Sequence, residues 1–144
     1  MTAAGSRALV TGIAAVAPNG MDTSTFWSST LAGRSGLREI ARFDARGYPS
    51  RIAGLLDDPE AYCEPRLAVQ TDRWTQIALL AGQRALKDAR LGPTDVPAFE
   101  TSVITASSSG GNEFGQREIE ALWSKGPKSV GPFQSIAWFY AVNN

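Results

Sequence analysis

Residues 105–127 read TASSSGGNEFGQREIEALWSKGP. The run that leads into this stretch, SVITAS at 102–107, contains valine, isoleucine and threonine, which favour a strand. Two adjacent glycines then favour a tight turn, and Gly126-Pro127 ends the helical pattern that follows. The stretch therefore predicts a strand, a glycine turn and an amphipathic helix, in that order.

One face of the predicted helix carries a stripe of three residues. Asn112, Gly115 and Ile119 are spaced i, i+3 and i+7, which places them on the same side of a helix. A glycine inside a helix costs about 0.5–1 kcal/mol relative to alanine, so the space at Gly115 has a use. Close packing of another backbone is the commoner reason for such a glycine, and room for a ligand is the other. A phosphate-binding turn is disfavoured because the turn contains no lysine or arginine.

On the C-terminal side, residues 132–144 read PFQSIAWFYAVNN and predict another helix, with proline near its N-terminus. Eight of the last twelve side chains are apolar or aromatic, whereas chain ends are usually polar and exposed. Such a helix needs another surface to cover it. We therefore expect further polypeptide to be bound against this helix.

On the N-terminal side, the sequence predicts a mixed α/β arrangement. ALVTGIAAVAP (8–18) is an apolar run that predicts a buried strand, and Pro18-Asn19-Gly20 predicts a turn after it. The next helix spans 23–32, with Asp22 or Thr23 as its N-cap and Gly33 at its C-terminal end. Residues 34–70 predict irregular structure with short extended pieces at most. The strongest helical pattern covers 72–91, begins at Thr71 or Asp72, and is expected to stop at Gly92-Pro93.

Composition argues against several classes of function. The chain has 144 residues, zero formal net charge, no histidine and one cysteine, Cys63. Zero net charge argues against nucleic acid or an anionic membrane as partner, and no apolar run reaches the ~20 residues of a membrane helix. Only Arg66 lies near Cys63 as a cation that could activate a thiolate, and no metal-ligand spacing is present. We expect a cytoplasmic protein with no catalytic residue, metal or cofactor of its own.

The first apolar run allows an alternative. VTGIAAVAPNG at 10–20 is similar to the opening of a short-chain dehydrogenase, in which a glycine-rich turn holds a pyrophosphate. Gly12 and Gly20 are eight residues apart, however, and Pro18-Asn19 lie between them. Close packing at Gly12 is the simpler interpretation, and a nucleotide-binding oxidoreductase remains the alternative.

Several stretches resemble the N-terminal third of a β-ketoacyl synthase, and more narrowly the chain length factor of aromatic type II polyketide synthases. They are VTGIAAVAPNG, FWSSTLAGRSGL, RFDARGYPSRIAG, QTDRWTQIALLAGQRALKDA, TASSSGGNEFGQREIEALWSKGP and FQSIAWFYAVNN. The first three occur in forms common to most ketosynthases. WSKGP with SIAWFYAVN is the strongest part of the resemblance to chain length factors.

The resemblance implies a thiolase-like layered α/β fold with a mixed sheet between helices, of which residues 1–144 would be the N-terminal portion. It also implies a non-catalytic subunit, in a heterodimer with a catalytic ketosynthase, that sets polyketide chain length. A catalytic β-ketoacyl synthase fragment is the alternative within the family. The implied partners are the ketosynthase, the remaining C-terminal polypeptide of the same subunit and an acyl carrier protein.

The resemblance also implies residue roles. Matching the motifs places Asn112, Gly115, Ile119 and Ile136 on the wall of the polyketide tunnel. Family members often carry phenylalanine where this sequence has Asn112.

A further expectation concerns the end of the sequence, Asn143-Asn144. Related proteins have a glycine within the next residue or so, and asparagine before glycine can form a succinimide that expels the next residue's amine. We therefore expect backbone cleavage after Asn144, with a companion polypeptide that begins with glycine, and ordinary proteolysis is the alternative.

Overall fold

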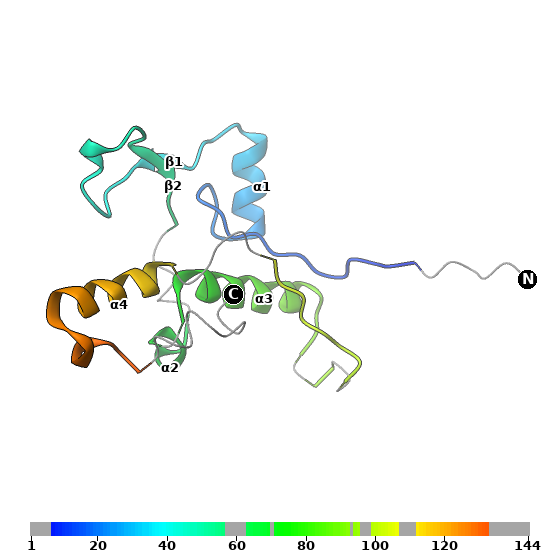
Figure 1. The fold of residues 1–144 in the computed structure, drawn as a ribbon. Coiled ribbons are helices and arrows are strands. Elements are labelled where there is room, and N and C mark those ends of the chain that lie inside the picture. Colours follow the sequence, from blue (N-terminus) through cyan, green and yellow to red (C-terminus); the bar gives the residue numbers. More distant parts are fainter. Residues whose placement is uncertain are drawn as a thin grey trace, which may run out of the picture.

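The structure is a computed structural model that describes residues 7–56, 63–69, 71–92, 94–95, 99–106 and 112–132. Figure 1 shows the described elements in an open arrangement. Helix α1 lies above α3 at a steep angle to it, and the β1–β2 hairpin and α4 lie at the left of the view. In chain order the elements are α1 (Thr23–Leu31), β1 (Leu37–Glu39), η1 (Ala45–Gly47), β2 (Ile52–Gly54), α2 (Pro65–Ala68), α3 (Arg73–Asp88), α4 (Asn112–Lys125) and η3 (Pro127–Ser129).

The predicted start and end of α1 are confirmed. The Asp22 carboxylate accepts a hydrogen bond from the Thr25 backbone N–H at 2.9 Å, which satisfies one of the N–H groups at the start of the helix. At the other end, Gly33 has φ +64, a left-handed conformation that glycine adopts without steric cost. The cap and the glycine therefore bound the helix as the sequence predicts.

The start of α3 is also as predicted, but its end is not. Asp72 is the N-cap, and its carboxylate accepts from the Thr75 N–H at 3.0 Å. The helix ends at Asp88, earlier than the predicted stop at Gly92-Pro93. Leu91 N–H donates to Leu86 O at 2.9 Å and Arg90 N–H donates to Lys87 O at 3.0 Å, the bonds of a Schellman motif. Arg90, with φ +58, occupies the left-handed position that glycine usually holds.

The N-terminal segment departs from the prediction of a buried strand over 8–18. It forms no ladder, and its one β-bridge joins Ala17 to Gly20 across the predicted turn. Leu9 and Val10 are 81% and 83% exposed. The run has the composition of a strand, but a strand also needs a neighbour to receive its hydrogen bonds. Within the described residues no other strand lies beside it.

Gly12 fixes where this segment crosses α3. A Cβ added at Gly12 would lie 2.3 Å from the backbone oxygen of Ala85 and 2.7 Å from the Ala89 Cβ. The backbone of the segment therefore touches the last turn of α3, and only glycine fits there. This contact confirms the interpretation that Gly12 serves close packing.

The predicted strand over 102–107 is also not formed in its described part. Residues 101–106 are assigned to no strand, and Val103 and Ile104 are 89% and 91% exposed. The reason is the same as for the first segment, since apolar composition alone does not supply a neighbouring strand.

Residues 34–56 contain a hairpin of short strands. β1 and β2 pair antiparallel with Arg38 opposite Ala53, and Ile40 N–H donates to Arg51 O at 2.9 Å beyond the strands. Across the described residues these strands form the one sheet. The prediction of short extended pieces over 34–70 is confirmed here, but the four-residue helix α2, Pro65–Ala68, was not predicted.

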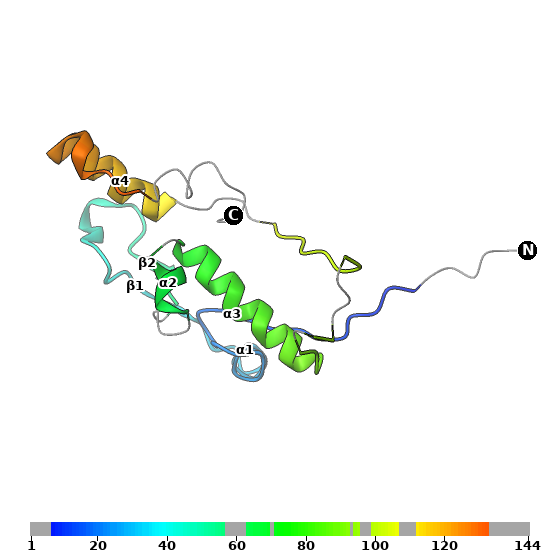
Figure 2. The same cartoon turned by 90° about the horizontal axis from the view of Figure 1, so that it is seen from below.

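The predicted helix after the glycine turn is confirmed as α4, which begins at Asn112. Figure 2 shows α4 beyond the N-terminal end of α3. Gly126, with φ +87, follows the helix, and η3 packs back against α4. The predicted helix over 132–144 lies outside the described residues except for Pro132.

Candidate functional site

The stripe predicted on α4 is described in part. Gly115 is buried, and Ile119, one turn further along the helix, is 39% exposed. Asn112 is the first residue of the helix, and its side chain lies outside the description. Ile136 and Asn144 fall outside the described residues. Two of the four predicted tunnel residues therefore lie on one side of one helix, and the cleavage at Asn144 stays a prediction.

A contact that sequence reasoning missed fixes the loop after α4. The Glu118 carboxylate accepts a hydrogen bond from the Gly131 backbone N–H at 2.5 Å, in a part-buried position. A Cβ on Gly131 would lie 3.1 Å from a Glu118 carboxylate oxygen, so glycine allows the close approach. Glu118 precedes Ile119 directly, and Gly131 directly precedes Pro132. No local sequence pattern pairs a helix glutamate with a glycine thirteen residues later.

The exposed part of α4 carries an indole. Trp123, in the WSKGP motif, is 83% exposed, whereas Leu122 beside it is half-buried. The half-buried side of the helix faces the loop that Glu118 holds, because η3 packs there. The Ile119 side chain lies between these two sides and is only partly covered.

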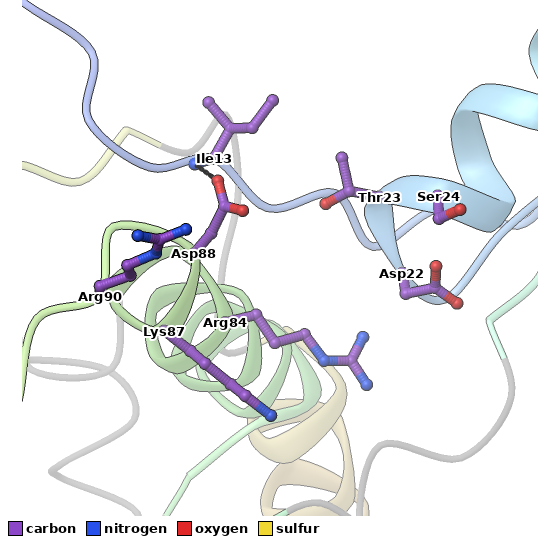
Figure 3. A pocket seen from close by; sticks show the side chains of 8 residues that line it. All are labelled: Ile13, Asp22, Thr23, Ser24, Arg84, Lys87, Asp88 and Arg90. Atoms are coloured by element: carbon purple, nitrogen blue, oxygen red, sulfur yellow. Dashed lines mark hydrogen bonds between the residues drawn. The ribbon is translucent and has the colours of Figure 1, made fainter.

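An open pocket of about 500 Å³ lies between the N-terminal end of α1 and the last turns of α3. Figure 3 shows the eight residues that line it: Ile13, Asp22, Thr23, Ser24, Arg84, Lys87, Asp88 and Arg90.

One carboxylate and one guanidinium of this pocket join its walls. Asp88 accepts from the Ile13 N–H at 2.9 Å, and the Arg84 guanidinium donates to the Met21 carbonyl. Hydrogen bonds from Thr25, with a smaller contribution from the charge of Arg84, lower the pKa of Asp22. These groups tie the N-terminal segment and α1 to α3. The pocket is therefore explained by packing of the fold.

The part of the chain that the structure describes contains one thiol. No cluster of three His, Cys, Asp or Glu side chains that could hold a metal ion occurs among those residues. Cys63 is a free, half-buried thiol. Among the same residues, no helix is long and apolar enough to cross a membrane.

Comparison with known proteins identifies relatives along almost the whole sequence. The family model for the N-terminal domain of beta-ketoacyl synthases matches residues 6–142. The tetracenomycin polyketide synthase ketoacyl synthase beta subunit of Streptomyces glaucescens is 51% identical over 137 residues, which are 94% of this chain and 34% of the relative. The chain thus spans about a third of the length of the curated relatives it matches.

Solved structures give the same result. The AntDE:AntF complex, a type II polyketide synthase acyl-carrier protein with its ketosynthase bound to the hexaketide, matches with a TM-score of 0.71 and 25% identity. That match covers 94% of this chain and 37% of the other. The ishigamide ketosynthase/chain length factor matches with a TM-score of 0.67 and 25% identity over 88% of this chain and 32% of the other.

These matches confirm the α/β thiolase-like fold class that the resemblance implies. They also set aside the oxidoreductase alternative, in agreement with the packing role of Gly12. The chain belongs to the beta-ketoacyl synthase family, whose N-terminal domain it matches from residue 6 to residue 142.

Proposed function

We propose that this chain is part of a chain length factor, the non-catalytic subunit that forms a polyketide tunnel with a catalytic ketosynthase. The support is twofold. A relative at 51% identity is named a ketoacyl synthase beta subunit of a polyketide synthase. One structural neighbour is a ketosynthase/chain length factor.

The geometry of α4 is the observation that carries the tunnel proposal. Gly115 is buried and has no side chain of its own, and Ile119 presents a mid-sized apolar side chain one turn later. An apolar wall with one small residue suits a growing poly-β-ketone, because the side-chain volume at each position limits the length that fits. Asn112 and Ile136 are the other wall positions of this proposal.

The proposed assembly has three further members. They are the catalytic ketosynthase, the remaining polypeptide of this subunit, and an acyl carrier protein that delivers malonyl units. The exposed Val103 and Ile104 give the remaining polypeptide an apolar surface to cover. The assembly would work in the cytoplasm, where a free thiol such as Cys63 stays reduced.

The test is product length in a reconstituted synthase that contains the complete subunit, its ketosynthase and the carrier protein. Gly115→Thr and Ile119→Phe should shorten the polyketide while condensation continues, because each adds volume to the wall. Arg117→Phe is the matched control, since Arg117 is exposed and lies two residues from both Gly115 and Ile119, on the other side of the helix. Its products should equal those of the parent.

Two outcomes would count against the proposal. An unchanged product distribution in both wall variants would remove the tunnel role of these residues. Condensation by this subunit without the ketosynthase would favour the alternative, a catalytic β-ketoacyl synthase.

A further inference from the structure

The turn between the N-terminal segment and α1 contains an asparagine followed by a glycine. The sequence contains four asparagines, and of these Asn19 alone is followed by glycine within it. This dipeptide is chemically reactive, because the backbone nitrogen of the glycine can attack the side-chain carbonyl carbon of the asparagine. Glycine has no side chain that hinders the approach. The half-buried Asn19 before the buried Gly20 is therefore a candidate site of spontaneous modification.

The fold requires the glycine of this dipeptide. A Cβ added at Gly20 would lie 2.1 Å from the Phe26 backbone nitrogen and 2.4 Å from the Phe26 Cα. These are backbone atoms of α1, which cannot swing aside as the end of a flexible side chain can. Any other residue at position 20 would push α1 away from the turn. The reactivity of the dipeptide is therefore limited by contacts around the turn rather than by the choice of residue.

Two hydrogen bonds hold the two groups that would react. The Gly20 N–H, whose nitrogen would attack, donates to the Ala17 carbonyl at 2.9 Å. The Asn19 Nδ2, which would leave, donates to the Thr30 hydroxyl oxygen at 3.3 Å. The Thr30 hydroxyl donates its one hydrogen to the Phe26 carbonyl at 2.8 Å, so it faces Asn19 as an acceptor. Attack requires the nitrogen to lose its proton and the amide to turn toward it, and these hydrogen bonds oppose both steps.

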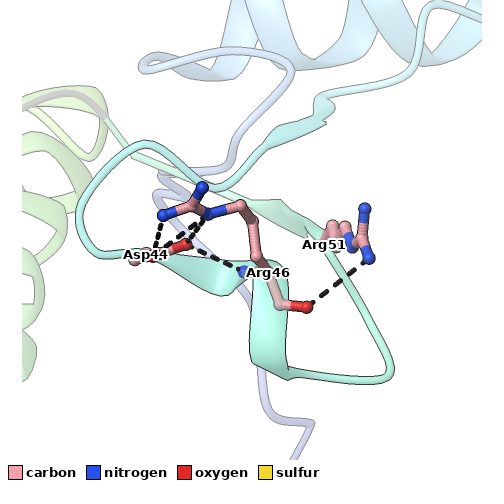
Figure 4. A network of polar contacts seen from close by, with 3 residues as sticks. All are labelled: Asp44, Arg46 and Arg51. Carbon is pink, nitrogen blue, oxygen red and sulfur yellow. Dashed lines mark hydrogen bonds and ion pairs between the residues drawn. The ribbon is translucent and has the colours of Figure 1, made fainter.

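A further contact comes from the chain that leads into β1. A Cβ added at Gly36 would lie 2.5 Å from the Asn19 backbone nitrogen, so the two backbones touch. The hairpin behind this contact is also held at its far end. Figure 4 shows the Arg46 guanidinium against the Asp44 carboxylate, with Nη2 2.7 Å from Oδ2, and the Arg51 guanidinium donates to the Arg46 carbonyl at 3.5 Å. Helix α1 and the hairpin region therefore both restrict the turn.

We propose that Asn19 is a site of spontaneous deamidation, and that the contacts between the turn and α1 set its rate. The Gly20 nitrogen bonds to the side-chain carbonyl carbon of Asn19, and its proton passes through solvent water to the leaving amide nitrogen. Ammonia departs, and a cyclic succinimide remains. Water then adds to either carbonyl of the ring, which gives isoaspartate or aspartate. The inference does not depend on the proposed function.

The modification weakens the contacts that delay it. Thr30 lies in the last turn of α1, where the helix dipole is negative. A carboxylate in place of the Asn19 amide cannot donate to Thr30 and adds a negative charge at that end of the helix. Isoaspartate also adds one atom to the backbone, which disturbs the paired hydrogen bonds between Ala17 and Gly20. Deamidation at Asn19 therefore favours release of the turn from α1.

The test follows deamidation by peptide mass mapping of the protein in the complex in which it is produced. Trypsin releases residues 8–34 as one peptide, in which Asn19 is the one residue with a side-chain amide. The peptide 91–117, in which Glu113 follows Asn112, is the internal control. We expect isoaspartate and aspartate to accumulate at Asn19 and not at Asn112. In urea-unfolded protein, where the turn contacts are absent, accumulation at Asn19 should be at least about tenfold faster.

Variants of one hydroxyl test the role of α1. Thr30→Val should speed the reaction in the folded complex about threefold to tenfold, the effect of one hydrogen bond on local opening. Thr30→Ser keeps the hydroxyl and should match the parent. Ser124→Ala is the matched control, because the Ser124 hydroxyl donates to the Glu120 carbonyl on α4 as the Thr30 hydroxyl donates to Phe26 on α1. Its rate at Asn19 should equal that of the parent.

Three outcomes would overturn the proposal. Equal rates in the parent and Thr30→Val, or equal acceleration in Thr30→Val and Ser124→Ala, would remove the control by α1. Aspartate without isoaspartate at Asn19 would exclude the succinimide, because direct hydrolysis of the amide gives aspartate alone. An unmodified Asn19 in the unfolded protein, after the time in which the folded complex is followed, would exclude the site itself.

Discussion

The Glu118 carboxylate on α4 accepts a hydrogen bond from the Gly131 backbone N–H, with 2.5 Å between nitrogen and oxygen. This hydrogen bond fixes the chain where it runs back beside α4. Gly126 and η3 start the reversal, and the contact between Glu118 and Gly131 closes it. The direction in which the chain continues after Gly131 therefore depends on a side chain in the middle of α4.

Removal of this hydrogen bond should loosen residues 126–132. Glu118→Ala should cost about 1–2 kcal/mol of local stability, because it deletes a charge-assisted hydrogen bond in a part-buried position. Glu118→Gln keeps an acceptor oxygen and should lose less. Amide hydrogen exchange of Gly131 in the natural complex measures the difference. Equal protection of this amide in both variants and the parent would refute the closing role of Glu118.

Glycine-to-alanine substitutions at two positions should have opposite effects. Gly12→Ala places a Cβ 2.3 Å from the Ala85 oxygen and should destabilise the fold by about 1–3 kcal/mol, the usual cost of overpacking. Gly82→Ala, within α3, meets nothing within 4 Å and should stabilise it by about 0.5–1 kcal/mol through helix propensity. Denaturant unfolding of both variants measures the two signs. A neutral Gly12→Ala would mean that the N-terminal segment does not touch α3.

The end of α3 offers a test of backbone strain. Arg90 has φ +58, a conformation that costs a residue with a side chain about 1–2 kcal/mol. Arg90→Gly should relieve most of this cost, whereas Arg90→Ala should retain it. Both variants lose the charge, so the difference between their unfolding free energies isolates the backbone and should be about 1 kcal/mol in favour of glycine. Equal stabilities would place Arg90 outside the left-handed region.

The N-cap of α1 should make stability depend on acidity. Hydrogen bonds from Thr25 lower the pKa of Asp22 below its ordinary value of 3.8. The ionised carboxylate therefore stabilises the fold fully above that value, and the contribution disappears as the pH falls through the lower pKa of the folded state. Asp22→Asn keeps an oxygen acceptor but does not titrate. As the pH falls from above 3.8 through the lower pKa of the folded state, the melting temperature of the parent should approach that of Asp22→Asn. A constant difference between the two melting temperatures over this pH range would contradict the prediction.

Local features of the fold were predictable from sequence, and contacts between distant residues were not. The caps at Asp22 and Asp72 and the left-handed Gly33 depend on the nearest few residues, and all three are as predicted. The end of α3 was placed too late because Arg90, a residue that rarely adopts a left-handed conformation, takes the position expected of glycine.

Tertiary partners account for the other differences. The segments 7–16 and 101–106 have strand composition but no strand beside them among the described residues, so composition alone overpredicted them. For the candidate site, spacing placed Gly115 and Ile119 correctly on one helix. The contact between Glu118 and Gly131 depends on how the loop folds back, which no spacing rule contains.

The two exposed extended segments have a consequence for self-association. Exposed apolar segments with β-branched residues are templates on which identical chains can stack. Arg7 and Pro18 border the first segment, and Glu100 precedes the second. A charge or a proline at such a border acts as a gatekeeper, because like charges repel in register and proline offers no N–H to a neighbour. Until other polypeptide covers these segments, the three border residues are the chain's own protection against aggregation.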